Sequence, residues 1–393
     1  MLRSCTLFVL VGISTFALAQ NSSVSGTSAS QPSTKMQVVY VVDNSTLTTY
    51  NVDPQTFVPT EAGTLTLKES VYPNIVPSPN DRFFYYTAFE NYSQQGQKLY
   101  VYDTNSLGVP ATEAVQTIAV SRLFGGIVID AVSKFVYVAS EGTPGSNTTP
   151  WYIYRFVLDP ATGKLSQRVT EATYSLQSNV EVCDLSIMGL NAAGTELYDG
   201  IGCINPEGTS ATYNQRSVNV QTGALGADVQ IYSSSDYNGG SERVQFVKNL
   251  MFDFVSPNNP SGQTGELVNV YRIKPNETTP TISCGSSMFD ACGDFILGLV
   301  NPTAKYVFLT NPQSVTEIGA VNLSTQQITE TSSIPYEVQE FSPDGTIAYA
   351  ANDAGTALEI EIYGFNLASG AVTQGGVINV PSDLDSWVTA ERY

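Results

Sequence analysis

The chain lacks histidine altogether: none of its 393 residues is one. Without an imidazole to act as base, neither a Ser-His-Asp triad nor a Cys-His pair can form, so hydrolases of those two types are excluded. The chain also lacks a C-x-x-C pair, which together with the missing histidines leaves no ligand set for a structural zinc ion. No GxSxG, Walker or GxGxxG motif occurs, so the sites that such loops build are not expected.

Positive charge is scarce. The chain has 17 lysine and arginine residues against 36 aspartate and glutamate residues, which gives a formal net charge of −19. A surface this acidic repels phosphate backbones and anionic lipid headgroups, so we expect neither nucleic acid nor an anionic membrane as a partner. The simplest explanation of the charge is that it keeps an exported domain soluble.

Long amphipathic helical patterns are missing as well. Hydrophobic residues make up 42% of the chain and aromatic residues 10%, whereas only 13% are charged. The chain also contains 31 glycines and 20 prolines. This composition is typical of a β-rich protein with many turns, and it supplies enough apolar side chains for a large core.

The N-terminal residues 1–19 have the pattern of a signal peptide. Arg3 precedes an apolar run from Leu7 to Ile13, and Ala17-Leu18-Ala19 is a plausible cleavage site. The run is too short to cross a bilayer comfortably, and no other segment qualifies, so we expect no membrane span and a secreted or periplasmic location. Residues 20–35 are rich in Ser and Thr and predict a flexible leader, which leaves residues 36–393 as the folded domain.

The clearest structural pattern is the stretch from Tyr336 to Val380. Ser342-Pro343-Asp344-Gly345 is a strong turn signal between two short β-rich runs, and Ala357 to Phe365 alternates apolar with polar residues. Four antiparallel strands in about 45 residues match one blade of a β-propeller. The third strand and its turn recur in seven copies, with these aligned positions: Asp53, Asp103, Asp159, Val220, Lys274, Leu323 and Leu367.

The two ends of the repeat region indicate how the ring closes. The run from Met36 to Val42 corresponds to a second strand, so the first unit lacks its innermost strand, while Ser382 to Thr389 is a leftover strand. Pairing the leftover strand with the first unit leaves no open edge in the ring. The prediction is an all-β, seven-bladed β-propeller of four-stranded antiparallel blades, closed by the C-terminal strand pairing into blade 1, and a monomer.

The turn Ser342 to Gly345, with a third strand that leads into Asp159-Pro-Ala-Thr-Gly-Lys-Leu165, resembles the seven-bladed lactonase-like propellers. That family includes 6-phosphogluconolactonase-type and YVTN-repeat-like proteins, and the resemblance extends over residues 36–393. It implies a site at the mouth of the central channel, built from histidine, arginine and glutamate near the starts of the inner strands. At the position where the family often has histidine, this chain has Asn74, Gly126, Ile187, Leu297 and Val338.

Four cysteines remain after signal cleavage, and an even number in an exported chain favours two disulfides. Cys183 and Cys203 are symmetric about Ala193, so an antiparallel hairpin would place them directly opposite each other. Cys284 and Cys292 would then close a small loop.

Ionisable residues near the ends of the predicted inner strands are the candidates for chemistry. As catalytic candidates the sequence offers Arg122, Glu181, Glu242 and Arg243. As binding candidates it offers Asn74, Asp184, Glu337, Glu340 and Asp385. Convergence at the channel mouth would permit acid/base work or a divalent cation, with no other cofactor implied. The alternative is that they are solvated rim residues or simple ion pairs.

Aromatic residues offer a second kind of site. Trp151, Tyr152, Tyr154 and the run from Phe83 to Tyr86 could stack on sugar rings, although aromatic side chains in strands more often pack in the core.

Three hypotheses for function follow. The first is an exported scaffold that binds a small molecule, a carbohydrate or a protein through one face or the channel mouth. The second is a lactonase-like hydrolase or isomerase that acts on a sugar lactone or related carbohydrate at the channel mouth. The third is a structural role in the cell envelope.

Overall fold

The computed structural model describes residues 36–43, 45–68, 71–79, 82–89, 98–119, 126–130, 132, 134–140, 150–174, 182–191, 193–205, 208–234, 243–255, 267–274, 279–285, 295, 297–353, 358–380 and 384–392. The predicted signal peptide and leader lie outside these ranges. The described residues form 28 β-strands and no helix.

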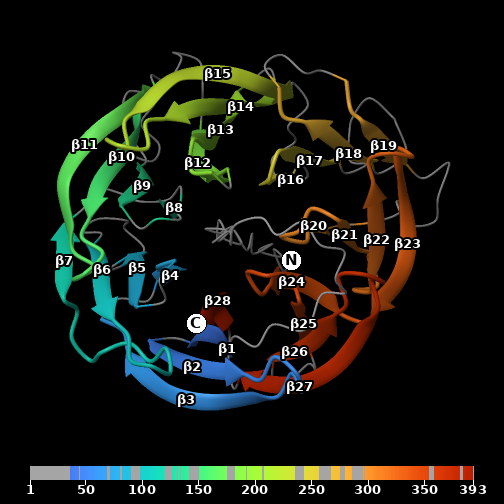
Figure 1. Cartoon of the computed structure of the whole chain (residues 1–393), viewed down its shortest axis with the longest axis horizontal. Helices are drawn as coiled ribbons and strands as arrows, with labels where there is room; N and C mark the ends of the chain where they lie inside the picture. Colours follow the sequence, from blue (N-terminus) through green and yellow to red (C-terminus); the bar gives the residue numbers. More distant parts are fainter. Residues whose placement is uncertain are drawn as a thin grey trace, which may run out of the picture.

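The strands form seven four-stranded antiparallel sheets arranged as blades around a centre (Figure 1). The innermost strand of each blade is named first and the outermost last. Blade 1 contains β28 (Leu384–Arg392), β1 (Met36–Asp43), β2 (Thr46–Val52) and β3 (Pro59–Thr66). Blade 2 contains β4 (Val71–Pro77), β5 (Phe83–Phe89), β6 (Lys98–Asp103) and β7 (Gln116–Ala119). Blade 3 contains β8 (Ile127–Ile129), β9 (Phe135–Ser140), β10 (Trp151–Leu158) and β11 (Leu165–Tyr174).

The remaining blades follow the same order. Blade 4 contains β12 (Val182–Leu190), β13 (Glu196–Asn205), β14 (Gly208–Val218) and β15 (Leu225–Ser234). Blade 5 contains β16 (Arg243–Val247), β17 (Leu250–Val255), β18 (Leu267–Arg272) and β19 (Ile282–Gly285). Blade 6 contains β20 (Leu297–Val300), β21 (Tyr306–Thr310), β22 (Thr316–Asn322) and β23 (Gln327–Ile334). Blade 7 contains β24 (Glu337–Phe341), β25 (Ile347–Asp353), β26 (Leu358–Phe365) and β27 (Val372–Val380).

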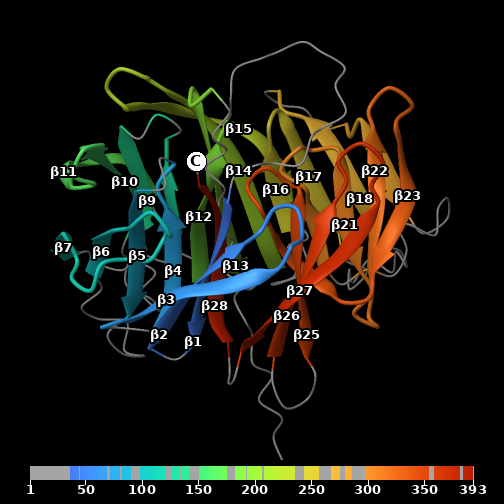
Figure 2. The ribbon, with the colours of Figure 1, turned by 60° about the horizontal axis from the view of Figure 1, so that its bottom comes forward.

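The predicted closure of the ring is confirmed. β28 pairs antiparallel with β1, so that Arg392 lies opposite Met36 and Val388 lies opposite Tyr40. Blade 1 is therefore assembled from both ends of the repeat region. Because the blades are antiparallel and share one strand order, the first-to-second and third-to-fourth strand turns lie at one end of the propeller, which we call the turn end. These turns point upward in Figure 2, as the turn between β22 and β23 shows.

The third-to-fourth strand turns of blades 1, 3, 4, 6 and 7 share a side-chain cap. The Asp53 Oδ1 atom accepts hydrogen bonds from the backbone N–H groups of Gln55 and Thr56, at 2.8 Å each. These two bonds lower the pKa of the Asp53 carboxyl. The equivalent residues make the same kind of turn: Asp159, Asn219, Asn322 and Asn366. Asp and Asn serve equally well because each offers an oxygen to the backbone two residues on.

These caps correct part of the predicted repeat alignment. Val220, Leu323 and Leu367 each lie one residue after the cap rather than at it. In blade 2 the cap is Asn105, whose Oδ1 accepts from Leu107 N at 2.8 Å, and not Asp103. The predicted alignment used acidic residues and their apolar neighbours as landmarks. It therefore missed the asparagine side chains, which cap the turn as aspartate does.

Tyrosine side chains on the second strands form hydrogen bonds to the neighbouring blade. The hydroxyl of Tyr40 donates to the Gly108 carbonyl at 2.9 Å, and the hydroxyl of Tyr85 donates to the Gly163 carbonyl of the next blade at 2.9 Å. The Tyr137 hydroxyl repeats this bond to Gly223 at 2.7 Å. Gly163 has a φ of 68°, and a β-carbon there would lie 2.4 Å from the Phe83 ring, so this turn accepts only glycine.

At the seam between blades 7 and 1, the turn supplies an aromatic ring instead of a glycine. The turn residue is Phe57, with a φ of 58°. The Phe57 ring fills a notch on blade 7, where a β-carbon on Gly364 would lie 2.1 Å from it. The Gly376 N–H donates to the Phe57 carbonyl at 2.9 Å. Ile347 begins the second strand of blade 7, at the position that Phe83 and Phe135 occupy in blades 2 and 3. In this seam the aromatic ring therefore comes from the turn of one blade and not from the strand of the other.

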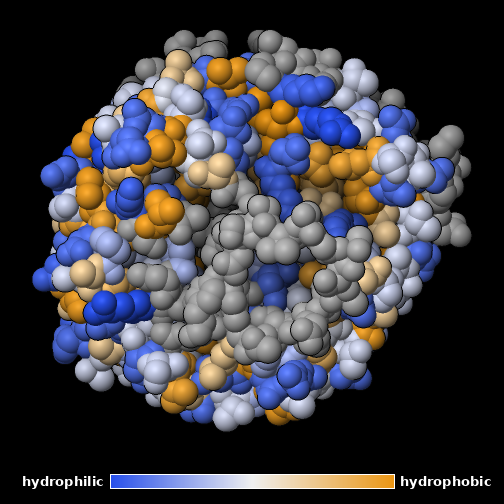
Figure 3. Space-filling model, in the orientation of Figure 1, coloured by the Kyte–Doolittle hydropathy of each residue, from blue (hydrophilic) through white to orange (hydrophobic). Residues whose placement is uncertain are grey.

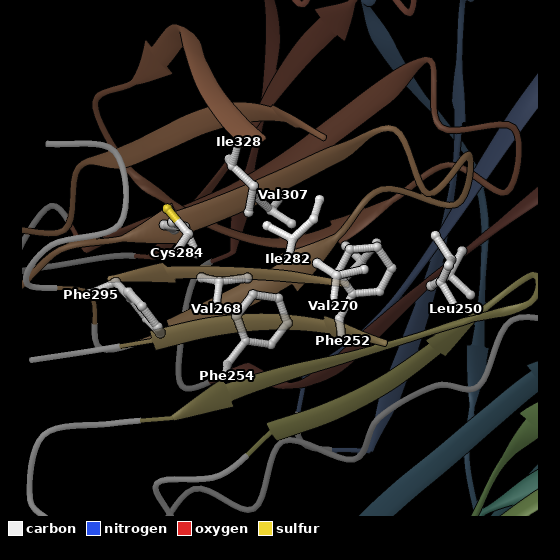
Figure 4. Close-up of a cluster of buried hydrophobic side chains, with 13 residues drawn as sticks. Leu250, Phe252, Phe254, Val268, Val270, Ile282, Cys284, Phe295, Val307 and Ile328 are labelled. Atoms are coloured by element: carbon white, nitrogen blue, oxygen red, sulfur yellow. The ribbon is translucent and has the colours of Figure 1, made fainter. Parts of the chain in front are cut away.

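Apolar side chains fill the space between blades. The cluster between blades 5 and 6 is drawn in Figure 4, where Phe252 and Phe254 lie against Val268 and Val270, with Ile328 on the other side. Burying each such side chain contributes roughly 1.5–3 kcal/mol, so these inter-blade layers are the main source of stability.

Candidate functional site

The inner strands β4, β8, β12, β16, β20, β24 and β28 surround the centre of the ring (Figure 1). Six of the predicted site residues belong to these strands: Asn74 on β4, Asp184 on β12, Arg243 on β16, Glu337 and Glu340 on β24, and Asp385 on β28. Arg122, Glu181 and Glu242 lie outside the described residues. The side chains of Asn74, Asp184, Arg243 and Asp385 are also outside them, so their convergence stays a prediction.

The two described candidates, Glu337 and Glu340, lie three residues apart on β24. Glu337 begins the strand and accepts a hydrogen bond from Gln339 Nε2 at 3.2 Å. The register shifts between Val338 and Glu340, which leaves Gln339 in a bulge. Three residues of extended strand span about 10 Å, which is the separation expected for the backbones of the two glutamates.

Glu340 has an unusual environment for a carboxyl group. It lies opposite the fully buried Tyr349, and its Oε1 accepts a long bond, 3.4 Å, from Phe341 N. Burial raises the pKa of Glu340 to about 8. The Tyr349 hydroxyl finds no hydrogen-bond partner within the described part of the chain. A carboxyl with a raised pKa is better suited to donate a proton than to act as a nucleophile or a cation ligand.

A buried ionic network at the seam of blades 3 and 4 was not predicted. The Asp199 carboxylate, on β13, is fully buried; it accepts from Arg216 Nε at 2.8 Å and from Asn214 Nδ2 at 3.1 Å, and Tyr174 of blade 3 also donates to it. Arg216 Nη2 in turn donates to the Tyr174 hydroxyl at 2.6 Å. Each carboxylate oxygen of Asp199 thus has a partner, and the role of the network is to join two blades.

Asp253 occupies the same place in blade 5 without the arginine. Its Oδ2 accepts from Tyr232 at 3.0 Å and its Oδ1 has no partner among the described residues. Where blade 4 has Arg216, blade 5 has Tyr271, judged from their matching register. Burial without a counter-charge raises the pKa of Asp253 to about 6. A lone aspartate inside an apolar strand is the sequence signal that could have identified Asp199 and Asp253.

The aromatic candidates divide into two groups. Trp151 is 4% exposed and Phe83 to Tyr86 are all buried, so they are core residues, as the alternative interpretation predicted. Tyr152 and Tyr154 are partly exposed and stack on each other with their centroids 5.6 Å apart. The Arg168 guanidinium lies 5.2 Å from the Tyr154 ring centroid, so one ring face already has a partner.

The structure tests the cysteine predictions only in part. Cys183 and Cys203 are register partners on β12 and β13, which confirms that they lie directly opposite each other. Cys284 is buried on β19, and Cys292 lies outside the described residues. The two disulfide bonds stay predictions.

The described ranges contain no group of three or more Asp, Glu, Cys or His side chains able to hold a metal ion. A divalent cation in the channel therefore stays a prediction. Nor do these ranges include a helix of the length and apolarity that a membrane crossing needs.

The turn end displays a set of exposed apolar side chains. The exposed fractions are 51% for Val58, 44% for Leu107, 66% for Val132 and 45% for Val220. Each belongs to a turn at this end, in blades 1, 2, 3 and 4 respectively. Figure 3 views this end and shows apolar residues spread among polar ones over the blades.

Comparisons with known proteins establish the fold and no more. No family model matches the chain, and no curated protein does. Among solved structures, the chain is similar to the periplasmic gluconolactonase PpgL of Pseudomonas aeruginosa, with 12% identity and a TM-score of 0.58 over 90% of this chain and 99% of that one.

Two further solved structures share the fold over part of their length. A prolyl endopeptidase matches with a TM-score of 0.53 and 12% identity, over 89% of this chain and 51% of that one. A puromycin hydrolase matches with a TM-score of 0.52 and 10% identity, over 90% of this chain and 55% of that one. Identities this low carry fold similarity only, so membership of the lactonase-like family stays a prediction.

Proposed function

We propose that the protein is an exported, monomeric scaffold that binds a ligand or partner protein through the turn end of its propeller. The observation that supports this most directly is the set of exposed apolar side chains on the turns of blades 1 to 4, Val58, Leu107, Val132 and Val220. Side chains of this kind bind a partner by leaving water, each contributing about 1–2 kcal/mol when fully covered.

Rigidity of the turns supports the same proposal. The turn that carries Val58 is capped by Asp53, and the turn that carries Val220 is capped by Asn219. The Tyr40 and Tyr137 bonds to neighbouring blades hold the turns of blades 2 and 4 in register. A pre-organised surface loses little conformational entropy on binding, which favours affinity.

Replacing the four turn residues with serine, Val58→Ser, Leu107→Ser, Val132→Ser and Val220→Ser together, tests the proposal. We expect affinity for a partner captured from the secretions of the source cells to fall at least about tenfold, because more than about 1.4 kcal/mol of apolar burial is lost. Surface plasmon resonance would measure the affinity.

The matched control is Val169→Ser with Val229→Ser, since these valines are 39% and 43% exposed on the outer strands. Equal affinities in the wild type and the turn variant would refute docking at the turn end.

A lactonase-like activity is the second candidate. It is supported by the similarity to a gluconolactonase over nearly its whole length, and by a carboxyl on an inner strand, Glu340, that keeps its proton at neutral pH. Glu337 lies at the start of the same strand, where the family resemblance expects site residues.

The test is hydrolysis of a sugar lactone, followed at constant pH by titration of the acid released. If the activity exists, Glu340→Gln is expected to lower kcat by at least about 100-fold, the usual contribution of a general acid. Glu330→Gln, on an outer strand, is the control. No turnover above the uncatalysed rate, or turnover unchanged in Glu340→Gln and Glu337→Gln, would rule out this mechanism.

A further inference from the structure

Blade 5 differs from its neighbours in one turn at the turn end. Val247 and Leu250 pair directly, so only Lys248 and Asn249 join β16 to β17. Lys248 adopts a φ of 58°, the left-handed region that costs an L-residue with a β-carbon about 1 kcal/mol relative to glycine. Nothing in the turn itself requires a lysine in this strained position.

A second lysine belongs to the neighbouring blade. Lys305 belongs to the corresponding turn of blade 6, between β20 and β21. The pKa of Lys248 is lowered by its partial burial and by the positive charge of Lys305. Like charges repel, so the two lysines on these neighbouring turns disfavour each other's charged form.

A guanidinium extends the positive charge. Arg272 ends β18 and lies opposite Leu250, two residues from Lys248, and the Ile273 N–H donates to the Asn249 carbonyl at 3.1 Å. Within the described part of the chain, none of Lys248, Arg272 and Lys305 forms a salt bridge. In Figure 3, hydrophilic and apolar residues lie side by side over the ends of β16 to β18.

This concentration of charge contrasts with the composition of the chain. Only 17 residues are lysine or arginine, against 36 acids, yet two adjacent blades bring three cations together at the turn end without a salt bridge to any described acid. We propose that Lys248, Lys305 and Arg272 form a binding site for an oxyanion group, that is, a sulfate, phosphate or carboxylate. Two ammonium groups supply point charges, and the guanidinium supplies paired donors to two oxygens.

The energetics of the site favour an anion of this type. An oxyanion between Lys248 and Lys305 replaces their mutual repulsion with two attractions, and the partial burial of Lys248 strengthens both. The site would also account for a strained lysine where glycine would be more stable. It lies apart from the apolar turns of blades 1 to 4 and does not depend on the docking proposed for them.

The test uses inorganic sulfate as the probe, titrated by calorimetry at constant ionic strength against chloride. The wild type is expected to bind sulfate, and Lys248→Gly and Lys305→Gln are each expected to weaken binding at least about tenfold, since each removes a charged partner of the anion. Glycine accepts the backbone of position 248, so Lys248→Gly should melt at or above the wild-type temperature, which separates loss of the site from loss of the fold.

Lys164→Gln is the control, because Lys164 is an exposed cation of a turn at the same end in blade 3. A second arm repeats the titration with a sulfated polysaccharide. Binding of free sulfate identifies a free-ion site, and binding of the polymer alone identifies a group carried on a chain. Either result supports the site if it is lost in Lys248→Gly and kept in Lys164→Gln. Absence of binding in both arms, or binding that Lys248→Gly and Lys305→Gln leave unchanged, overturns the proposal.

Discussion

The Arg216→Met variant is expected to unfold with about 3–5 kcal/mol less free energy than the wild type. Arg216 lies 2.8 Å from the fully buried Asp199 carboxylate, with both side chains 7% exposed or less. Methionine fills similar space but leaves the Asp199 charge without its counter-ion and removes a donor to Tyr174. Urea unfolding followed by tryptophan fluorescence would measure the loss.

The exposed pair Arg82–Asp103 provides the control. Its atoms are 3.8 Å apart and its side chains are 54% and 45% exposed, so Arg82→Met should cost less than about 1 kcal/mol. The double variant Arg216→Met with Asp199→Asn should recover much of the loss, since no buried charge then remains. A loss for Arg216→Met as small as that of Arg82→Met would contradict a buried ionic network.

Stability is expected to rise as the pH falls from about 8.5 to about 5, because the folded state holds a proton on Glu340. The unfolded state releases that proton near pH 4.5, whereas the folded state releases it near pH 8. The stabilisation is therefore complete below about pH 4.5, shrinks through the interval, and is lost above about pH 8. Its size is at most on the order of 5 kcal/mol. Denaturant unfolding at several pH values would show the trend.

Two variants test which carboxyl groups cause this pH dependence of stability. Glu340→Gln should match the wild type near about pH 4 and exceed it in stability at about pH 8.5, because glutamine places no charge in this partly buried site. Asp253→Asn should remove a second, smaller dependence between about pH 4 and 6, the interval set by its raised pKa. A pH profile identical in the wild type and Glu340→Gln would show that this carboxyl is solvated in the folded protein.

Much of the fold was predictable because each blade is built locally. The Ser342 to Gly345 turn, the alternating strands on either side and the spacing of the copies depend on neighbours within one blade. The closure also followed from a simple requirement, namely that the leftover strand at the C-terminus must cover the open edge beside Met36 to Asp43.

The candidate site was much less predictable, for a physical reason. A strand pattern fixes which residues share a face but not what faces them from the next blade. Asp199 and Asp253 occupy equivalent places in blades 4 and 5. Asp199 is paired with Arg216, whereas Asp253 has Tyr271 at the matching position and a raised pKa. Lys248 was missed in the same way, since its neighbour Lys305 belongs to another blade.

Blade 1, which is assembled from both ends of the repeat region, also determines the order in which the protein can fold. Blades 2 to 7 consist of strands adjacent in sequence, so each can form from hairpins as soon as its own segment is available. Blade 1 must wait for β28, because Val38 pairs with Ala390 from the far end of the chain. During synthesis, the edge of β1 therefore remains uncovered until β28 emerges, and this interval is when the chain is most exposed to pairing with the wrong strand.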